Sequence, residues 1–264
     1  MKFERVLFII ILILLAPIYV SAENSSSIEK LDEISDEALQ MVKYEKYDDA
    51  KKLLDYFSNQ FANLTGNERS FTLDQLRIMT ISHDEALEAT VSPNMKYEER
   101  LNKLTKFRLV MDAVASKHQP LWTGMEDQMF STLDQVKNAA SKKEINQFNR
   151  HLNSFLSLYN VIYPSLKIDV PASSIQKLDA RINFIDEYRS QMAVDAKYVK
   201  ELDSLEADLK KLFDEVNEDE ADPSLWWVII STGSIIIMTL SYVGWRKYKG
   251  DKEMRKNRSR DRKD

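Results

Sequence analysis

The three histidines are the side chains best suited to metal binding or general acid–base chemistry in this sequence. His83, His118 and His151 lie on different predicted helices or at their ends, and none belongs to an H-E-x-x-H pair. His83 falls on an apolar stripe, where a hydrogen-bonded core histidine is the commoner outcome. The sequence therefore predicts no metal site and no cofactor. A site assembled from all three histidines in space stays open as an alternative.

The 42 Asp and Glu residues offer many pairs of the kind that glycosidases use. Such pairs need a polar cleft held by loops, and only five Gly and six Pro leave few loops to build one. A G-x-S-x-G elbow and a phosphate-binding glycine loop are both absent, and the lack of cysteine excludes thiol nucleophiles and zinc-thiolate sites. The protein is predicted not to be an enzyme, with no catalytic residues.

Apolar residues recur at helical spacing in nearly every segment, which predicts an all-α fold arranged as an antiparallel helical bundle. We expect helices over residues 26–42, 50–66, 72–92, 97–118, 120–140 and 141–164. Ser26 with Glu29 and Ser141 with Glu144 match capping boxes. The alternation in residues 164–173 predicts an extended connector. Residues 174–217 contain neither Gly nor Pro, so we expect one long helix or two nearly collinear ones, continuing as a stalk.

Residues 38–54 are similar to the helix pair of a tetratricopeptide repeat, with Ala38 at its small position. A second copy would place alanine where Asp84 stands, so no array follows. An ordinary tight helical hairpin is the preferred interpretation.

Residues 223–245 are 23 consecutive uncharged residues in a chain otherwise dense with charge. A helix of that length covers roughly 35 Å, enough to cross the apolar core of a bilayer. Six acids precede it in residues 214–222, and ten Lys or Arg follow it in residues 246–264 against four acids. The positive-inside rule therefore predicts a transmembrane helix at 223–245 with a basic cytoplasmic tail at 246–264. The predicted membrane-anchoring residues are Trp226, Trp227, Tyr242, Trp245, Arg246 and Lys247.

Residues 1–22 have a short positive region, an apolar run and a small residue at Ala22, which predict a signal peptide. Cleavage after Ala22 is the preferred interpretation, and a first transmembrane helix is the alternative. Either interpretation leaves residues 23–222 as an extracytoplasmic helical domain. That domain carries 25 Lys or Arg against 37 Asp or Glu, a balance that argues against nucleic acid as a partner.

The order of parts resembles the YpjB-type sporulation proteins of endospore-forming bacilli. The parts are the leader, the cysteine-free helical domain with `KYEKYDDAKKLLDYF`, the `HQPLW` turn, the `WW`-led apolar segment and the basic tail. The resemblance implies a membrane protein of sporulation with an unknown biochemical role, and it supplies no site residues.

The sequence thus favours a single-pass scaffold or binding protein at the cell membrane, whose acidic domain meets an envelope protein. Ser234 and Ser241 on one face of the apolar segment give a weak indication of a homo-oligomer. The alternative is a membrane sensor or regulatory subunit that signals through the stalk to the basic tail.

Overall fold

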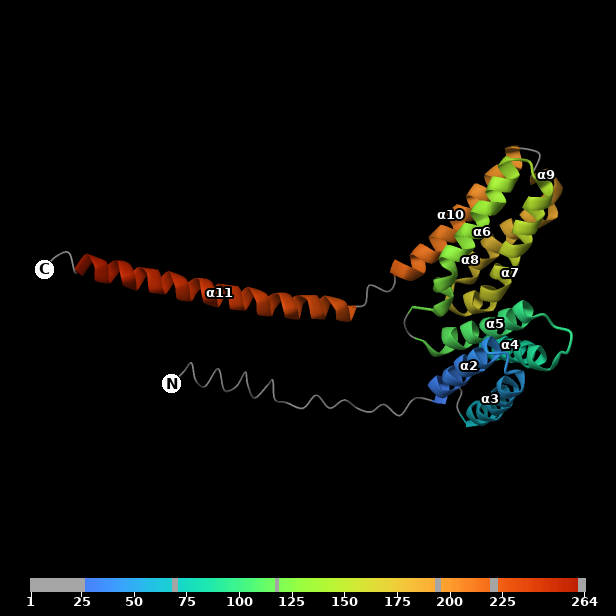
Figure 1. Cartoon of the computed structure of the whole chain (residues 1–264), viewed down its shortest axis with the longest axis horizontal. Coiled ribbons are helices and arrows are strands. Elements are labelled where there is room, and N and C mark those ends of the chain that lie inside the picture. The colour runs from blue at the N-terminus through green and yellow to red at the C-terminus, as the bar shows by residue number, and fades with distance from the viewer. Residues whose placement is uncertain (1–26, 68–70, 117–118, 193–195, 219–222, 261–264) are drawn as a thin grey trace. The chain divides into compact units, whose positions relative to one another are not determined.

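The computed structural model in Figure 1 describes residues 27–67, 71–116, 119–192, 196–218 and 223–260. Every regular element in these ranges is helical, which confirms the predicted all-α class. The chain divides into two compact units, one of Met1–Trp122 with Ser154–Ala172 and the other of Thr123–Asn153 with Ser173–Asp264. The predicted leader at residues 1–22 and the Ser26 cap lie outside the described residues.

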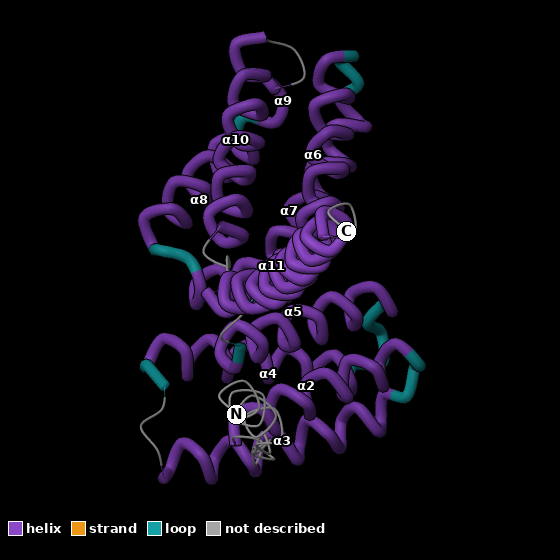
Figure 2. The backbone as a smooth tube through the Cα atoms, turned by 90° about the vertical axis from the view of Figure 1, so that its left-hand side faces the viewer, coloured by secondary structure: helices purple, strands orange, loops and turns teal. Residues whose placement is uncertain are grey.

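Unit 1 contains α2 (Ser27–Lys43), α3 (Tyr47–Asn67), α4 (Leu73–Val91), α5 (Tyr97–Ala115) and the C-terminal part of α7 (Ile145–Asp169). Figure 2 shows α2 to α5 side by side. In α2 the residues Leu31, Ile34, Ala38 and Val42, at steps of three or four, form a buried apolar stripe. The helix α5 is buried on several sides near its C-terminal end, where Leu109, Val110 and Met111 are consecutive. Removing these side chains from water supplies the main driving force for the unit. The fully buried large side chains of its core include Leu31, Leu54, Phe57, Met79, Leu104, Phe107 and Met111.

The turn between α2 and α3 confirms the predicted tight hairpin. Glu45 has a left-handed backbone with φ 57°, and the Lys46 amide donates to the carbonyl of Met41 at 2.9 Å. This pattern ends a helix in the way that usually requires glycine. Ala38 and Ala50 are both fully buried, so the helices can pack closely near the turn.

The N-terminus of α4 carries a complete capping box. The Gln75 amide donates to the Thr72 hydroxyl at 3.1 Å, and the Thr72 amide donates to the Gln75 side chain at 3.0 Å. The helix begins where the sequence predicts, next to Thr72 and Gln75.

The predicted extended connector at residues 164–173 is wrong, because α7 continues through Pro164 to Asp169. Proline removes one helical hydrogen bond, the one to the carbonyl of Asn160. The helical series Ile162 and Leu166, both fully buried, continues the apolar stripe across the proline. Burial of these side chains offsets the missing hydrogen bond.

Unit 2 contains a short 3₁₀ helix at Leu121–Met125, then α6 (Glu126–Ser141), the N-terminal part of α7, α8 (Ala172–Glu187), α9 (Arg189–Met192) and α10 (Ala196–Glu218). The first residues of the helix predicted at 120–140 form this 3₁₀ turn, and the rest of that helix is α6. The predicted cap at Ser141 is also wrong, since Ser141 ends α6 and Lys143, at φ 59°, forms the turn into α7.

The long or collinear helix expected over residues 174–217 is likewise wrong. The helices α8 and α10 lie antiparallel, because Lys177 pairs with Asp208 while Arg181 reaches back to Glu201. The Phe184 and Tyr198 rings, 6.0 Å apart, face each other across the connection. Contacts between residues that are distant in sequence therefore reverse the direction of the chain between α8 and α10, although the segment contains no glycine or proline.

The last helix, α11 (Pro223–Arg260), is continuous through the whole apolar segment and into the basic tail. Among the residues that the structure describes, no helix is both long enough and apolar enough to cross a membrane. The transmembrane helix at residues 223–245 therefore stays a prediction.

Candidate functional site

The predicted membrane-anchoring residues lie on α11, where the side chains of residues 230–250 are described. Tyr242 and Trp245 are 48% and 61% exposed, and Arg246 and Lys247 are also exposed. The side chains of Trp226 and Trp227 lie outside the described part. Lys249 places its ammonium 5.6 Å from the centre of the Trp245 ring. Aromatic and basic side chains in contact at the end of an apolar run are typical of a membrane interface.

Apolar side chains are exposed on every side of α11 between residues 230 and 245. Four consecutive residues, 235–238, cover the full turn of a helix, and all four are more than half exposed. The exposed apolar set is Ile230, Ile235, Ile236, Ile237, Met238, Leu240 and Val243. A helix that is apolar all round needs an apolar environment, either a protein core or a bilayer.

Hydroxyl groups on this part of α11 donate to carbonyls of the same helix. The Ser234 hydroxyl donates to Ile230 O at 2.6 Å, and the Thr239 hydroxyl donates to Ile236 O at 2.8 Å. These donors are therefore satisfied without water, as an apolar environment requires.

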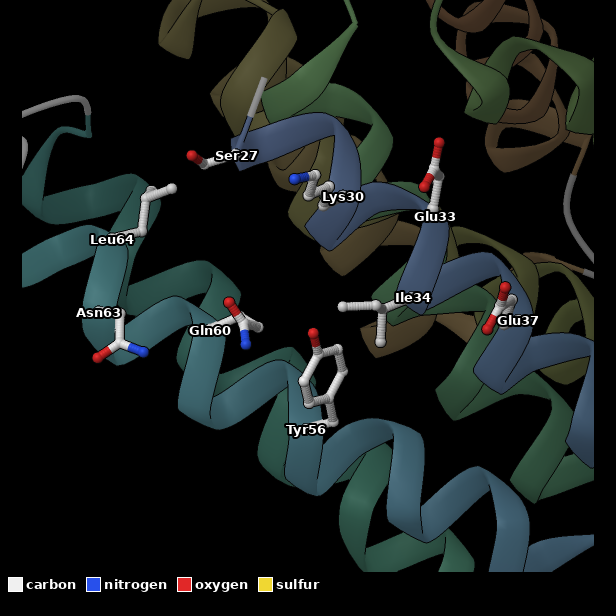
Figure 3. A pocket seen from close by; sticks show the side chains of 9 residues that line it. All are labelled: Ser27, Lys30, Glu33, Ile34, Glu37, Tyr56, Gln60, Asn63 and Leu64. Carbon is white, nitrogen blue, oxygen red and sulfur yellow. The ribbon is translucent and has the colours of Figure 1, made fainter. Parts of the chain in front are cut away.

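A groove of about 530 Å³ opens between α2 and α3 in unit 1. Figure 3 shows Tyr56 and Gln60 of α3 pointing toward α2, with Ile34 opposite them. Ile34 is 8% exposed and forms part of the apolar wall of the groove, whereas Tyr56 is half exposed. The other residues that line the groove are Ser27, Lys30, Glu33, Glu37, Asn63 and Leu64. The groove thus has an apolar wall and a polar, partly charged rim, and the residues that line it include no nucleophile paired with a base.

The sequence did not predict this groove. The sequence did indicate the hairpin of α2 and α3. The signal for the groove was that alanine residues lie near the turn of this hairpin, whereas large side chains lie at positions farther from the turn. Which face of the hairpin stays uncovered depends on where α4 and α5 pack, and that information is tertiary.

His83 is a core residue, as the preferred interpretation has it. Its Nε2 lies 3.0 Å from the carbonyl of Leu54, and its ring stacks on Phe57 at 5.2 Å between centroids. His118 lies outside the described residues, and His151 is half-buried in α7. Within the described part of the chain, no group of three His, Asp or Glu side chains is arranged to hold a metal ion.

A polar cluster that is largely buried fixes Leu121 and Trp122 to the core of unit 1. The Leu121 amide donates to Asp112 Oδ2 at 2.6 Å, and the Trp122 indole donates to Asp169 Oδ2 at 2.8 Å. Burial raises the pKa of Asp169 to about 6, while the indole donor acts in the opposite direction. Burial also raises the pKa of Asp112, against the Leu121 amide and the Arg108 charge. The contacts anchor a turn, so we assign this cluster a structural role.

The fold and these surfaces define an all-helical protein with a long helix whose apolar side chains are exposed. A family model described as Sporulation protein YpjB (SpoYpjB) matches residues 28–257, which includes both units and most of α11. The chain belongs to this family, and the predicted resemblance is confirmed.

A relative in Bacillus subtilis (strain 168) carries the name "Uncharacterized protein YpjB". The chain is 35% identical to it over 239 residues, which make up 90% of this chain and 90% of the relative. No solved structure matches the chain.

Proposed function

We propose that this member of a sporulation protein family is a single-pass membrane protein whose helical units form an extracytoplasmic binding or scaffold domain. The observation that carries the proposal is the exposed apolar surface around α11. No described contact covers it, and exposed apolar area of this extent marks a membrane or an interaction site.

The length of the uncharged run supports membrane insertion over burial in protein. It spans 23 residues, of which the seven at 223–229 precede the described side chains. A bilayer requires about 20 apolar residues in a helix. The ten basic residues of 246–264 support the orientation with the C-terminus in the cytoplasm.

The groove between α2 and α3 supports a binding role for the domain. Its charged rim of Lys30, Glu33 and Glu37 is exposed, and its volume lies within the range of ligand sites in proteins. We take an envelope protein as the partner, because the domain carries a strong excess of acidic residues and is predicted to lie outside the cytoplasm.

Single cysteines test the proposal directly, because the natural chain has none. Lys142→Cys lies in an exposed turn of unit 2, and Lys249→Cys lies after the apolar run. In protoplasts of starved cells, a membrane-impermeant maleimide should label position 142 and spare position 249 until the membrane is opened. Labelling of position 249 in intact protoplasts would contradict the topology.

The same reagent tests the groove. Gln60→Cys lines the groove, whereas Asn59→Cys is exposed beside it and does not. We expect position 60 to be labelled in the purified protein and protected in sporulating cells, with position 59 labelled in both. Equal labelling of the two positions in cells would contradict binding in the groove.

A further inference from the structure

A second hollow in unit 1 lies between α4, α5 and α7, and it has two lobes. The apolar lobe has a volume of about 200 Å³ and the polar lobe about 230 Å³. Glu85, Lys106 and Asn160 line both lobes and therefore lie at their junction. We refer to the two lobes together as the α4–α7 cleft.

The apolar lobe is walled by side chains that water solvates poorly. Ile81 lies in the middle of α4 and is 50% exposed, and Ile78 and Pro164 line the same lobe. Pro164 lies inside α7, where the cost of a proline must be offset by packing. An exposed isoleucine beside a helical proline is an apolar surface that a ligand can cover.

Positive charge flanks this lobe on two sides. The Lys106 side chain is only 11% exposed, and its ammonium donates to Glu85 Oε2 at 2.9 Å. An ammonium has three donors, so two of them are left for another acceptor. Lys167 holds its ammonium 4.5 Å from the centre of the Tyr163 ring. Two ammonium groups against one carboxylate give the lining of this lobe a net positive charge.

The junction also offers an uncharged donor. Within the described residues the side-chain amide of Asn160 has no hydrogen bond, and it lies on the exposed face of α7. An ammonium with spare donors beside a free amide is suited to a carboxylate, because a charge-assisted hydrogen bond is stronger than a neutral one.

We propose that the α4–α7 cleft binds a small amphipathic carboxylic acid. The carboxylate contacts Lys106 and Asn160, and the aliphatic or aromatic group packs against Ile81 and Pro164. The apolar lobe, at about 200 Å³, has room for a group about the size of one large side chain. The inference goes beyond the proposed function and does not depend on whether α11 crosses a membrane.

Fluorine NMR with fluorophenylacetate tests the proposal on the purified full chain in detergent, with detergent alone as the blank. We expect saturable binding of this probe, and at least about tenfold weaker binding of fluorobenzylamine, which carries the opposite charge. Absence of saturable binding, or equal binding of the amine, would overturn the proposal.

Three variants locate the site. Lys106→Met keeps the length of the side chain and removes its charge, so binding should weaken about tenfold or more. Ile81→Gln should weaken binding through the apolar lobe, and Val91→Gln, an equally exposed position on α4 outside the cleft, should leave it unchanged. Circular dichroism checks that each variant is folded. If Lys106→Met is misfolded, Ile81→Gln decides, because an exposed side chain can be replaced without loss of the core. Unchanged affinity in Ile81→Gln would also overturn the proposal.

Discussion

The two units of this protein use polar side chains in different ways. Unit 1 has surface ion pairs such as Lys103–Glu88, but it also buries a charged group that hydrogen-bonds to the backbone. Arg100 is 6% exposed, stacks 4.6 Å over the Tyr47 ring and donates to the carbonyls of Ala89, Ser92 and Met95. It thereby ties the loop between α4 and α5 to the core.

In unit 2, charged groups pair across the surface of a leucine-rich interior. Leu202, Leu205 and Leu209 of α10 are fully buried. Around them Lys137 of α6 pairs with Asp203 and Glu206 of α10 at 2.7 and 2.6 Å, with partly exposed side chains on both sides.

The difference predicts unequal consequences of mutation. A buried donor bonded to carbonyls leaves those acceptors unsatisfied when it is removed, whereas a surface ion pair is replaced by water. The interior hydrogen bonds of unit 1 are therefore specific to one backbone arrangement, and the ion pairs of unit 2 add little to the stability of its apolar packing.

Arg100→Ala should produce the largest effect. It leaves three carbonyls without their donor, and we expect a loss of about 3 kcal/mol in the free energy of unfolding. Arg181→Ala in unit 2, which breaks ion pairs to Glu201 and Asp208, is the matched control and should cost about 1 kcal/mol or less. Urea unfolding of the full chain in detergent, followed by circular dichroism, measures both. Equal losses would show that the units do not differ in this way.

The pH dependence of stability should also separate the units. Burial raises the pKa of Asp169 in unit 1 to about 6, above the value of 3.8 for a free Asp. Its contribution to stability is complete below 3.8 and is lost as the pH rises through 6, so lowering the pH from about 7.5 to about 5 should stabilise unit 1. Because the carboxyl is partly solvated, we expect about 1 kcal/mol.

Asp208 in unit 2 behaves in the opposite sense. Burial acts to raise its pKa, but hydrogen bonds from Lys177 and Arg181 outweigh burial and lower it. Its contribution is present above 3.8 and is lost only in more acidic solution. Urea midpoints at the two pH values check the difference, since Asp169→Asn should remove most of the gain and Asp208→Asn should retain it. A gain of full size in Asp169→Asn would assign the effect to another group, such as Asp112.

The sequence predicted those parts of the fold that depend on local signals. The apolar stripe of α2 and the Thr72 and Gln75 pair that begins α4 both belong to neighbouring residues, and the structure has them where expected. The errors at Pro164 and at the turn between α8 and α10 have a common cause. In both places packing of distant side chains outweighs the local preference of the chain.

The candidate surfaces were harder to predict than the helices. The apolar segment of α11 could be read directly, because its pattern is continuous in sequence. The groove between α2 and α3 and the α4–α7 cleft depend on which helix faces stay uncovered. Lys106 and Asn160 are 54 residues apart, and only the fold brings them to one junction.

The smallest prediction concerns a feature that the units share. Glu45 and Lys143 each turn a helical hairpin at positive φ, 57° and 59°, where glycine has no steric penalty. Glu45→Gly and Lys143→Gly should each stabilise the protein, by about 0.5 to 1 kcal/mol, because relief of the left-handed strain exceeds the added chain entropy of glycine. Both gains should be similar, since the turns have the same backbone hydrogen bonds and neither side chain is buried. Urea unfolding measures them, with Lys142→Gly, at an ordinary helical backbone, as the control that should be destabilising. A gain at only one of the two turns would mean that the units differ in their local backbone as well as in their polar contacts.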